Sequence, residues 1–135
     1  MDTISDFLAK IRNSLNAKKP LLKEKYSKIK LAIAKILLDE GYVEEIKKIE
    51  EEGTSYLLIS LRYTESNEPF IHSIKRLSSP GRHLYASYKD LPKIKPLAGY
   101  KQSLGIIIVS TSSGIMTSAE ARKRHLGGEL IAEIY

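Results

Sequence analysis

Gly105-Ile-Ile-Ile-Val-Ser-Thr-Ser-Ser-Gly-Ile-Met-Thr-Ser-Ala-Glu-Ala-Arg122 is the stretch that says most about the fold of this chain. The apolar run from Leu104 to Val109 predicts a buried strand, and small polar residues follow it at 110–114. Thr117 and Glu120 have the spacing of a capping box, in which each side chain satisfies the other residue's free backbone N–H. The stretch therefore predicts a strand, a Ser-rich loop held at its end, and a helix.

The segments on either side extend this pattern. Gly127-Gly128 is expected to end the helix, because glycine readily adopts the left-handed conformation that closes helices. Residues 129–135 alternate and predict the last strand. Before the quoted stretch, prolines and a glycine within 89–103 predict a loop. Further upstream, two strands are expected at 70–77 and 83–87, joined by the turn Ser78-Ser-Pro-Gly81.

The first half of the chain predicts two helices followed by a hairpin. Apolar residues at spacings of three and four indicate helices over 3–16 and 27–40, the second capped by Ser27 and ended by Gly41. Pro20 lies in a Lys-rich connection between them. Strands are expected at 42–49 and 55–63, with a turn at 50–53, and the polar stretch 64–69 predicts a boundary.

Together these elements predict the α+β class in two small lobes. Residues 1–68 would form an α/β lobe with two helices packed on a small sheet. Residues 69–135 would form a mostly β lobe with one short helix and the Ser-rich loop.

Charge is distributed unevenly along the 135 residues, whose net charge is +6. Residues 1–38 hold nine Lys/Arg against three Asp/Glu, and residues 71–128 hold ten against two. The intervening residues 39–70 hold three against nine. Two basic segments flanking an acidic one favour a polyanionic partner over a uniformly solvated surface.

Other classes of protein receive little support from the sequence. There is no cysteine and no apolar run near the roughly 20 residues that span a bilayer. We therefore expect a reducing compartment, no secretory leader and no membrane partner. His72, His83 and His125 lack metal-ligand spacing, and no Gly-x-Ser-x-Gly motif surrounds the serines. We expect no metal, no cofactor and no catalytic residue. A small hydrolase or nuclease that uses a loop serine and a histidine stays as the alternative.

RNA binding explains the same polar residues better than a catalytic role does. The hydroxyl groups of Ser110, Thr111 and Ser112 can hydrogen-bond to base edges, phosphates and ribose 2′-hydroxyls, although a plain β-turn would also explain them. Tyr85 and Tyr88 follow the turn Pro80-Gly81-Arg82 in a basic stretch and could stack on unpaired bases or lie in the core. In the first lobe, Arg12, Asn13, Lys28 and Lys30 are candidates for phosphate contacts, although helical lysines are often merely solvated.

The stretch 105–122, followed by Gly127-Gly128-Glu129, resembles the signature of the bacterial ribosomal protein eight family of the small subunit. The similarity extends over essentially the whole chain. It includes Ile11-Arg12-Asn13, Ser27-Lys28-Ile29-Lys30, Glu40-Gly41-Tyr42, Ser79-Pro80-Gly81 and Leu91-Pro92.

The resemblance implies a two-lobe α+β protein that binds a bulged helix in the central domain of 16S rRNA and helps the small subunit assemble. It also implies that the protein is a monomer outside the ribosome, contacts neighbouring small-subunit proteins, and represses its own operon by binding the messenger. A cytoplasmic or a plastid ribosome would fit, and so would a regulatory RNA-binding module that never joins a ribosome.

Carried over position by position, the resemblance implies two sets of RNA-binding residues. Those expected to confer specificity are Tyr85, Ser110, Thr111, Ser112, Gly127, Gly128 and Glu129. Those expected to contact the RNA backbone are Thr3, Arg12, Asn13, Ser27, Lys28, Lys30, Pro80, Gly81 and Arg82. The acidic hairpin at 44–52 is expected to face away from RNA.

The chain departs from the family at two places. The link 93–104 is several residues longer than usual and holds Lys93, Lys95 and Lys101, which could add RNA or protein contacts. Ser113 stands where a basic residue is frequent, which would remove one phosphate contact.

Overall fold

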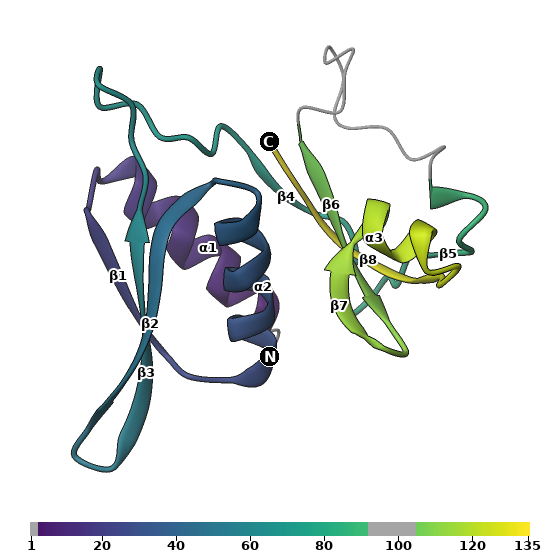
Figure 1. Ribbon diagram of the computed structural model, residues 1–135, viewed down its shortest axis with the longest axis horizontal. Coiled ribbons are helices and arrows are strands. Elements are labelled where there is room, and N and C mark those ends of the chain that lie inside the picture. Colours follow the sequence, from purple (N-terminus) through teal and green to yellow (C-terminus); the bar gives the residue numbers. More distant parts are fainter. Residues whose placement is uncertain (1–2, 92–104) are drawn as a thin grey trace. The chain divides into compact units, whose positions relative to one another are not determined.

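The computed structural model describes residues 3–91 and 105–135 (Figure 1). The chain divides into two compact units, residues 1–71 and 72–135. Helices and strands are mixed in the order expected of the α+β class, so the predicted class is confirmed. Residues 92–104 lie outside the described residues, and they include most of the loop predicted at 89–103, its three lysines and the adjoining Leu104.

Unit 1 is a three-stranded antiparallel sheet with two helices against one face (Figure 1). Its strands are β1 (Leu21–Lys25), β2 (Val43–Glu51) and β3 (Thr54–Leu61), in the order β1-β3-β2. Its helices are α1 (Thr3–Asn16) and α2 (Lys28–Asp39). The core is formed by the apolar stripes of both helices and by alternate residues of β3: Phe7, Leu8, Ile11, Leu15, Ile33, Ala34, Leu37, Leu57, Ile59 and Leu61 are all buried.

Both predicted helices of unit 1 are confirmed, together with the cap of the second. Ser27 has extended backbone angles, and its Oγ accepts a hydrogen bond from the backbone N–H of Lys30 at 3.1 Å. Gly41 follows the helix with φ +81°, a value that suits glycine. The capping residue and the glycine that follows the helix were therefore enough to predict where the second helix begins and ends.

The strand β1 is a correction, because residues 20–25 were expected to form a connection. In Leu-Leu-Lys-Glu-Lys the inward positions are Leu22 and Glu24, so the alternation of apolar and polar residues is hidden by a buried carboxylate. The strand forms because it pairs with β3, with Leu22 opposite Ile59 and Glu24 opposite Leu57.

Unit 2 is built around the last strand, β8 (Gly128–Ile134). The sheet order is β4-β8-β6-β7, and the short strand β5 (Tyr85–Ala86) also pairs with β8. The other strands are β4 (Ile74–Arg76), β6 (Ile106–Thr111) and β7 (Gly114–Thr117), and the helix α3 spans Ser118–Lys123. One cluster, here called the unit 2 core, contains the buried residues Leu91, Ile107, Val109, Met116, Ala121 and Leu130.

Several expectations for unit 2 need correction. The strand predicted at 70–77 is limited to β4, and the one predicted at 83–87 is limited to β5. Ser110 and Thr111 lie within β6, so the Ser-rich loop is a tight hairpin turn at Ser112-Ser113 leading into β7, which was not foreseen. The predicted strand at the end of the chain is confirmed as β8.

The predicted capping box of α3 is half formed, and its predicted end is wrong. Thr117 Oγ1 accepts from the N–H of Glu120 at 3.2 Å, but the Glu120 carboxylate pairs with Arg124 at 2.6 Å. That hydrogen bond holds the pKa of Glu120 below its ordinary value. The helix ends at Lys123, and His125 takes the left-handed conformation, with φ +59°. Gly127 and Gly128 are therefore not the helix stop.

Candidate nucleic-acid interface

Three of the predicted site residues lie in one row across neighbouring strands of unit 2. Tyr85 of β5 is opposite Glu129 of β8, and Glu129 is opposite Ser110 of β6. Paired residues of antiparallel strands place their side chains on the same face of a sheet. The neighbouring pair Val109 and Leu130 belongs to the unit 2 core, so the row lies on the opposite face.

The aromatic end of this row is open to solvent. The Tyr85 side chain is 71% exposed, which is high for a large ring. The ring of His83 is stacked against it, with 6.3 Å between centroids, and His83 Nδ1 lies 2.6 Å from Glu129 Oε2. His83 therefore connects the ring and the carboxylate of the row. Tyr88, by contrast, is partly buried against the unit 2 core, as the core interpretation predicted for one of the two tyrosines.

Thr111 stabilises the hairpin turn. Its hydroxyl donates to the carbonyl of Gly114 at 2.8 Å and accepts from the N–H of Ser113 at 3.1 Å. These bonds hold the turn that presents the exposed Ser112. The Thr111 hydroxyl therefore stabilises the conformation of this turn.

Gly127 and Gly128 allow neighbouring backbones to approach closely. A Cβ atom on Gly128 would overlap the carbonyl oxygen of Ser110. A Cβ on Gly127 would lie 2.6 Å from the carbonyl oxygen of Ala86 and 2.9 Å from Ser87 Cα. The two glycines therefore let β5 and β6 meet β8 at the level of the row, which is the physical reason for glycine here.

The turn Pro80-Gly81-Arg82 is exposed and held at its base. Ser79 and Arg82 exchange backbone hydrogen bonds of 2.9 and 3.0 Å. The adjacent Ser78 is fully buried, and its Oγ accepts from the N–H of Leu84 at 2.9 Å. Ser78 thus fixes the turn relative to β5. Sequence reasoning gave Ser78 only a place in the turn, and no local signal marks its buried hydrogen bond.

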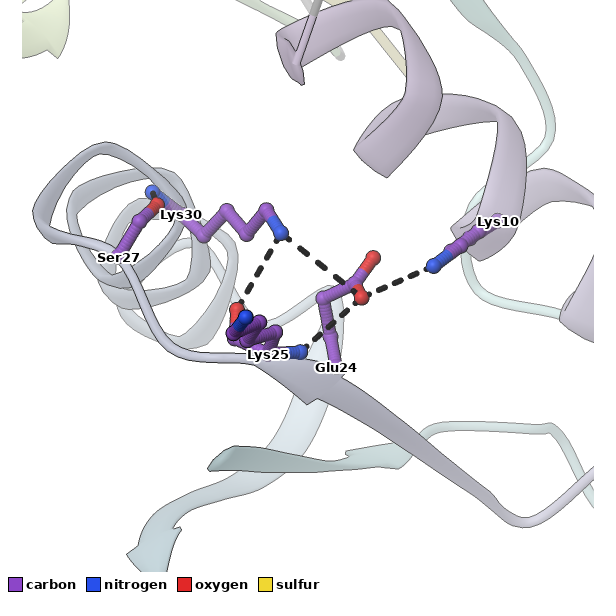
Figure 2. Close-up of polar contacts among 5 residues, drawn as sticks. All are labelled: Lys10, Glu24, Lys25, Ser27 and Lys30. Carbon is purple, nitrogen blue, oxygen red and sulfur yellow. Dashed lines mark hydrogen bonds and ion pairs between the residues drawn. The ribbon is translucent and has the colours of Figure 1, made fainter. Parts of the chain in front are cut away.

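The unit 1 residues that were predicted to contact the RNA backbone differ in their exposure to solvent. Thr3, Arg12, Asn13 and Lys28 are exposed on the two helices, whereas Ser27 is the N-cap. Lys30 turns inward: its Nζ donates to the carbonyl of Lys25 at 3.2 Å, and its side chain is only 13% exposed (Figure 2).

Lys10, Lys25 and Lys30 meet around Glu24, a buried carboxylate that sequence reasoning missed, and these four residues are called the Glu24 cluster. Its Oε1 accepts from Lys10 Nζ at 3.0 Å and from the N–H of Lys25 at 3.0 Å, and it lies 3.8 Å from Lys30 Nζ (Figure 2). Buried carboxylates are costly unless paired and hydrogen-bonded, and here both conditions are met. Glu24 joins α1, β1 and the start of α2.

The family model described as "Ribosomal protein S8" matches residues 2–135. The chain belongs to the ribosomal protein S8 family. Among its relatives are proteins named "Small ribosomal subunit protein uS8". The one from Trichodesmium erythraeum is 44% identical over 135 residues, and the one from Streptococcus agalactiae is 40% identical over 134. In both cases 99% of this chain and 97% of the relative are covered.

Membership of the ribosomal protein S8 family confirms the resemblance seen in the sequence. It gives the chain a structural role in the small ribosomal subunit. Within residues 3–91 and 105–135, no group of His, Cys, Asp and Glu residues could hold a metal ion. Every helix in the same ranges is too short or too polar to cross a membrane.

Proposed function

We propose that this ribosomal protein S8 chain binds 16S rRNA directly, at a bulged helix of the central domain, and so promotes subunit assembly. The observation that carries the proposal is the row of Tyr85, Glu129 and Ser110 on one face of the unit 2 sheet. An exposed ring, a carboxylate and a hydroxyl group, side by side on paired strands, are held at fixed spacing before RNA arrives.

Each member of the row has a distinct task in this proposal. The Tyr85 ring stacks on an unpaired base, which is worth about 1–3 kcal/mol. The Glu129 carboxylate, held by His83, accepts from base N–H groups, and the hydroxyls of Ser110 and Ser112 bond to base edges or ribose 2′-hydroxyls. Thr111, Gly127 and Gly128 act mainly by shaping the surface.

Contacts to the RNA backbone come from exposed groups on both units. In unit 1 these are Thr3, Arg12, Asn13 and Lys28, and in unit 2 the turn Pro80-Gly81-Arg82. Ser27 and Lys30 support the unit 1 groups through the helix cap and the Glu24 cluster. Repression of the chain's own operon would use the same surface, because a messenger with a similar bulged helix offers the same groups.

The test compares Tyr85→Leu with Tyr85→Phe. Binding is measured to a central-domain 16S fragment and to a fully paired duplex of equal length. Loss of the ring should weaken binding to the fragment at least about tenfold while leaving duplex binding nearly unchanged, and Phe should retain most of the affinity because the ring is kept. Equal losses on both RNAs would show that the row confers no specificity. Co-sedimentation with small subunits then separates a ribosomal from a purely regulatory role.

A further inference from the structure

A second surface of unit 2 combines aromatic rings with cations. It is a hollow lined by Tyr88, Lys89, Ala119, Arg122, Lys123 and His125. None of these residues belongs to the row of Tyr85, Glu129 and Ser110. We propose that this hollow binds an unpaired nucleotide, with its base on the two rings and its phosphates on the three cations. The inference rests on the proposed function, because it adds a second RNA contact to the same unit.

The two rings lie against each other, and the Tyr88 ring is also anchored in the fold. The ring centroids of Tyr88 and His125 are 4.8 Å apart, and the rings are inclined by 37°. Tyr88 packs against the unit 2 core, and the next buried residue, Leu91, belongs to that core. His125 is held by its backbone, which is left-handed and donates from N–H to the carbonyl of Arg122 at 3.0 Å. A preformed aromatic site binds a base with little loss of side-chain freedom.

The charges around the hollow favour an anion. Lys89, Arg122 and Lys123 all line it, and none of the described lining residues is acidic. The nearest acidic side chains in sequence are engaged elsewhere: Glu120 pairs with Arg124 at 2.6 Å, and Asp90 accepts from Ser87 Oγ at 3.1 Å. Arg122 and Lys123 also complement the C-terminal end of α3. That effect explains two of the cations but neither Lys89 nor the rings.

The position of the hollow suggests how one RNA strand could reach both sites. Tyr85 and Tyr88 are separated by Ala86 and Ser87, whose backbone passes directly over Gly127. This short segment therefore carries the exposed ring of Tyr85 at one end and Tyr88, which lines the hollow, at the other end. An acidic peptide would satisfy the cations but gain little from the rings, whereas a nucleotide uses both.

The experiment follows the side chains of the three histidines by NMR in the full chain. The probe is the RNA hexanucleotide of six adenylates, and hexaglutamate and tripolyphosphate serve as controls for charge alone. We expect the hexanucleotide to shift the His125 ring signals and to leave His72 unchanged. The central-domain 16S fragment should shift both His83, which lies beside Tyr85, and His125.

Two variants make the test quantitative. His125→Asn removes the ring but tolerates the left-handed backbone, and it should weaken binding of the hexanucleotide about fivefold. Arg122→Gln with Lys123→Gln should flatten the log–log salt dependence by about 0.7 for each phosphate contact. The control, Lys35→Gln with Lys47→Gln, removes the same charge from exposed positions in unit 1. It should leave unchanged the shift that the hexanucleotide causes in the His125 ring signals.

Three results would overturn the inference. One is binding of the 16S fragment with no change at His125. Another is hexaglutamate or tripolyphosphate shifting His125 as strongly as the hexanucleotide does, which would indicate an anion site only. The third is unchanged affinity of His125→Asn for the hexanucleotide. If the wild-type chain fails to bind the 16S fragment at all, the proposed function fails instead, and the two failures are thereby distinguished.

Discussion

The ammonium group of Lys30 lies 3.8 Å from Oε1 of Glu24, whose side chain is only 5% exposed. This relationship changes what Lys30 is expected to do. A lysine held between a buried carboxylate and the carbonyl of Lys25 belongs to the fold, whereas the nearby Lys28 is exposed. Two lysines that look equivalent in the sequence are therefore expected to behave differently.

Substitution of Lys28 and substitution of Lys30 should have different effects on the salt dependence of RNA binding. Lys28→Gln should flatten the log–log dependence of RNA binding on salt by roughly 0.7–0.9, as expected for one lost phosphate contact. Lys30→Gln should leave that slope nearly unchanged and instead lower the free energy of unfolding. Filter binding of the central-domain fragment at several salt concentrations measures the first, and urea unfolding measures the second. If Lys30→Gln flattened the salt dependence and left the free energy of unfolding unchanged, Lys30 would have to leave Glu24 and bind RNA.

Removing the charge of Glu24 should destabilise unit 1. Glu24→Gln weakens the pairing with Lys10 and Lys30 and leaves the largely buried Lys30 cation without a carboxylate. We expect a loss of about 2–3 kcal/mol, below the roughly 3–5 kcal/mol of a fully buried broken pair, because Lys10 is 56% exposed. Urea unfolding followed through amide signals of unit 1 measures it. The matched control is Glu65→Gln at an exposed position, which should change stability by less than about 0.5 kcal/mol.

Gly128→Ala should disrupt the meeting of β6 and β8. The added Cβ would overlap the backbone carbonyl of Ser110, which cannot move aside as a side chain could. We expect a loss of about 3 kcal/mol in unit 2, as for an overpacked site, together with loss of RNA binding. Gly81→Ala is the stability control, because a Cβ there meets nothing within 4 Å. Equal stability of the two variants, measured by thermal unfolding, would contradict this account of Gly128.

Thr111 and Ser112 should differ in how they affect RNA binding. Thr111→Val removes both hydrogen bonds of the turn and should cost about 1 kcal/mol of stability as well as affinity, whereas Thr111→Ser keeps the hydroxyl and should retain both. Ser112→Ala leaves those turn bonds in place and should weaken binding to the central-domain fragment alone. Affinities for the fragment and for generic duplex, measured beside thermal unfolding, separate the two roles. A loss for Ser112→Ala on both RNAs would remove its role in specificity.

The sequence alone determined the elements whose signals are local. The helices α1 and α2, the Ser27 cap and the buried strand β6 follow from the spacing of apolar residues and from capping groups a few positions away. Such signals work because the apolar repeat of a helix and its capping groups both involve positions only three or four residues apart in sequence. The α+β class and the family followed from the same stretches.

The tertiary structure decided what depends on distant partners. Pairing with β3 makes a strand of residues 21–25, and the close approach of β5 and β6 to β8 explains Gly127 and Gly128. His83 and Glu129 meet although they are 46 positions apart. The register of β5, β8 and β6 aligns Tyr85, Glu129 and Ser110, and no local pattern encodes that register. The residue types were visible in the sequence, but only long-range strand pairing could make one surface of them.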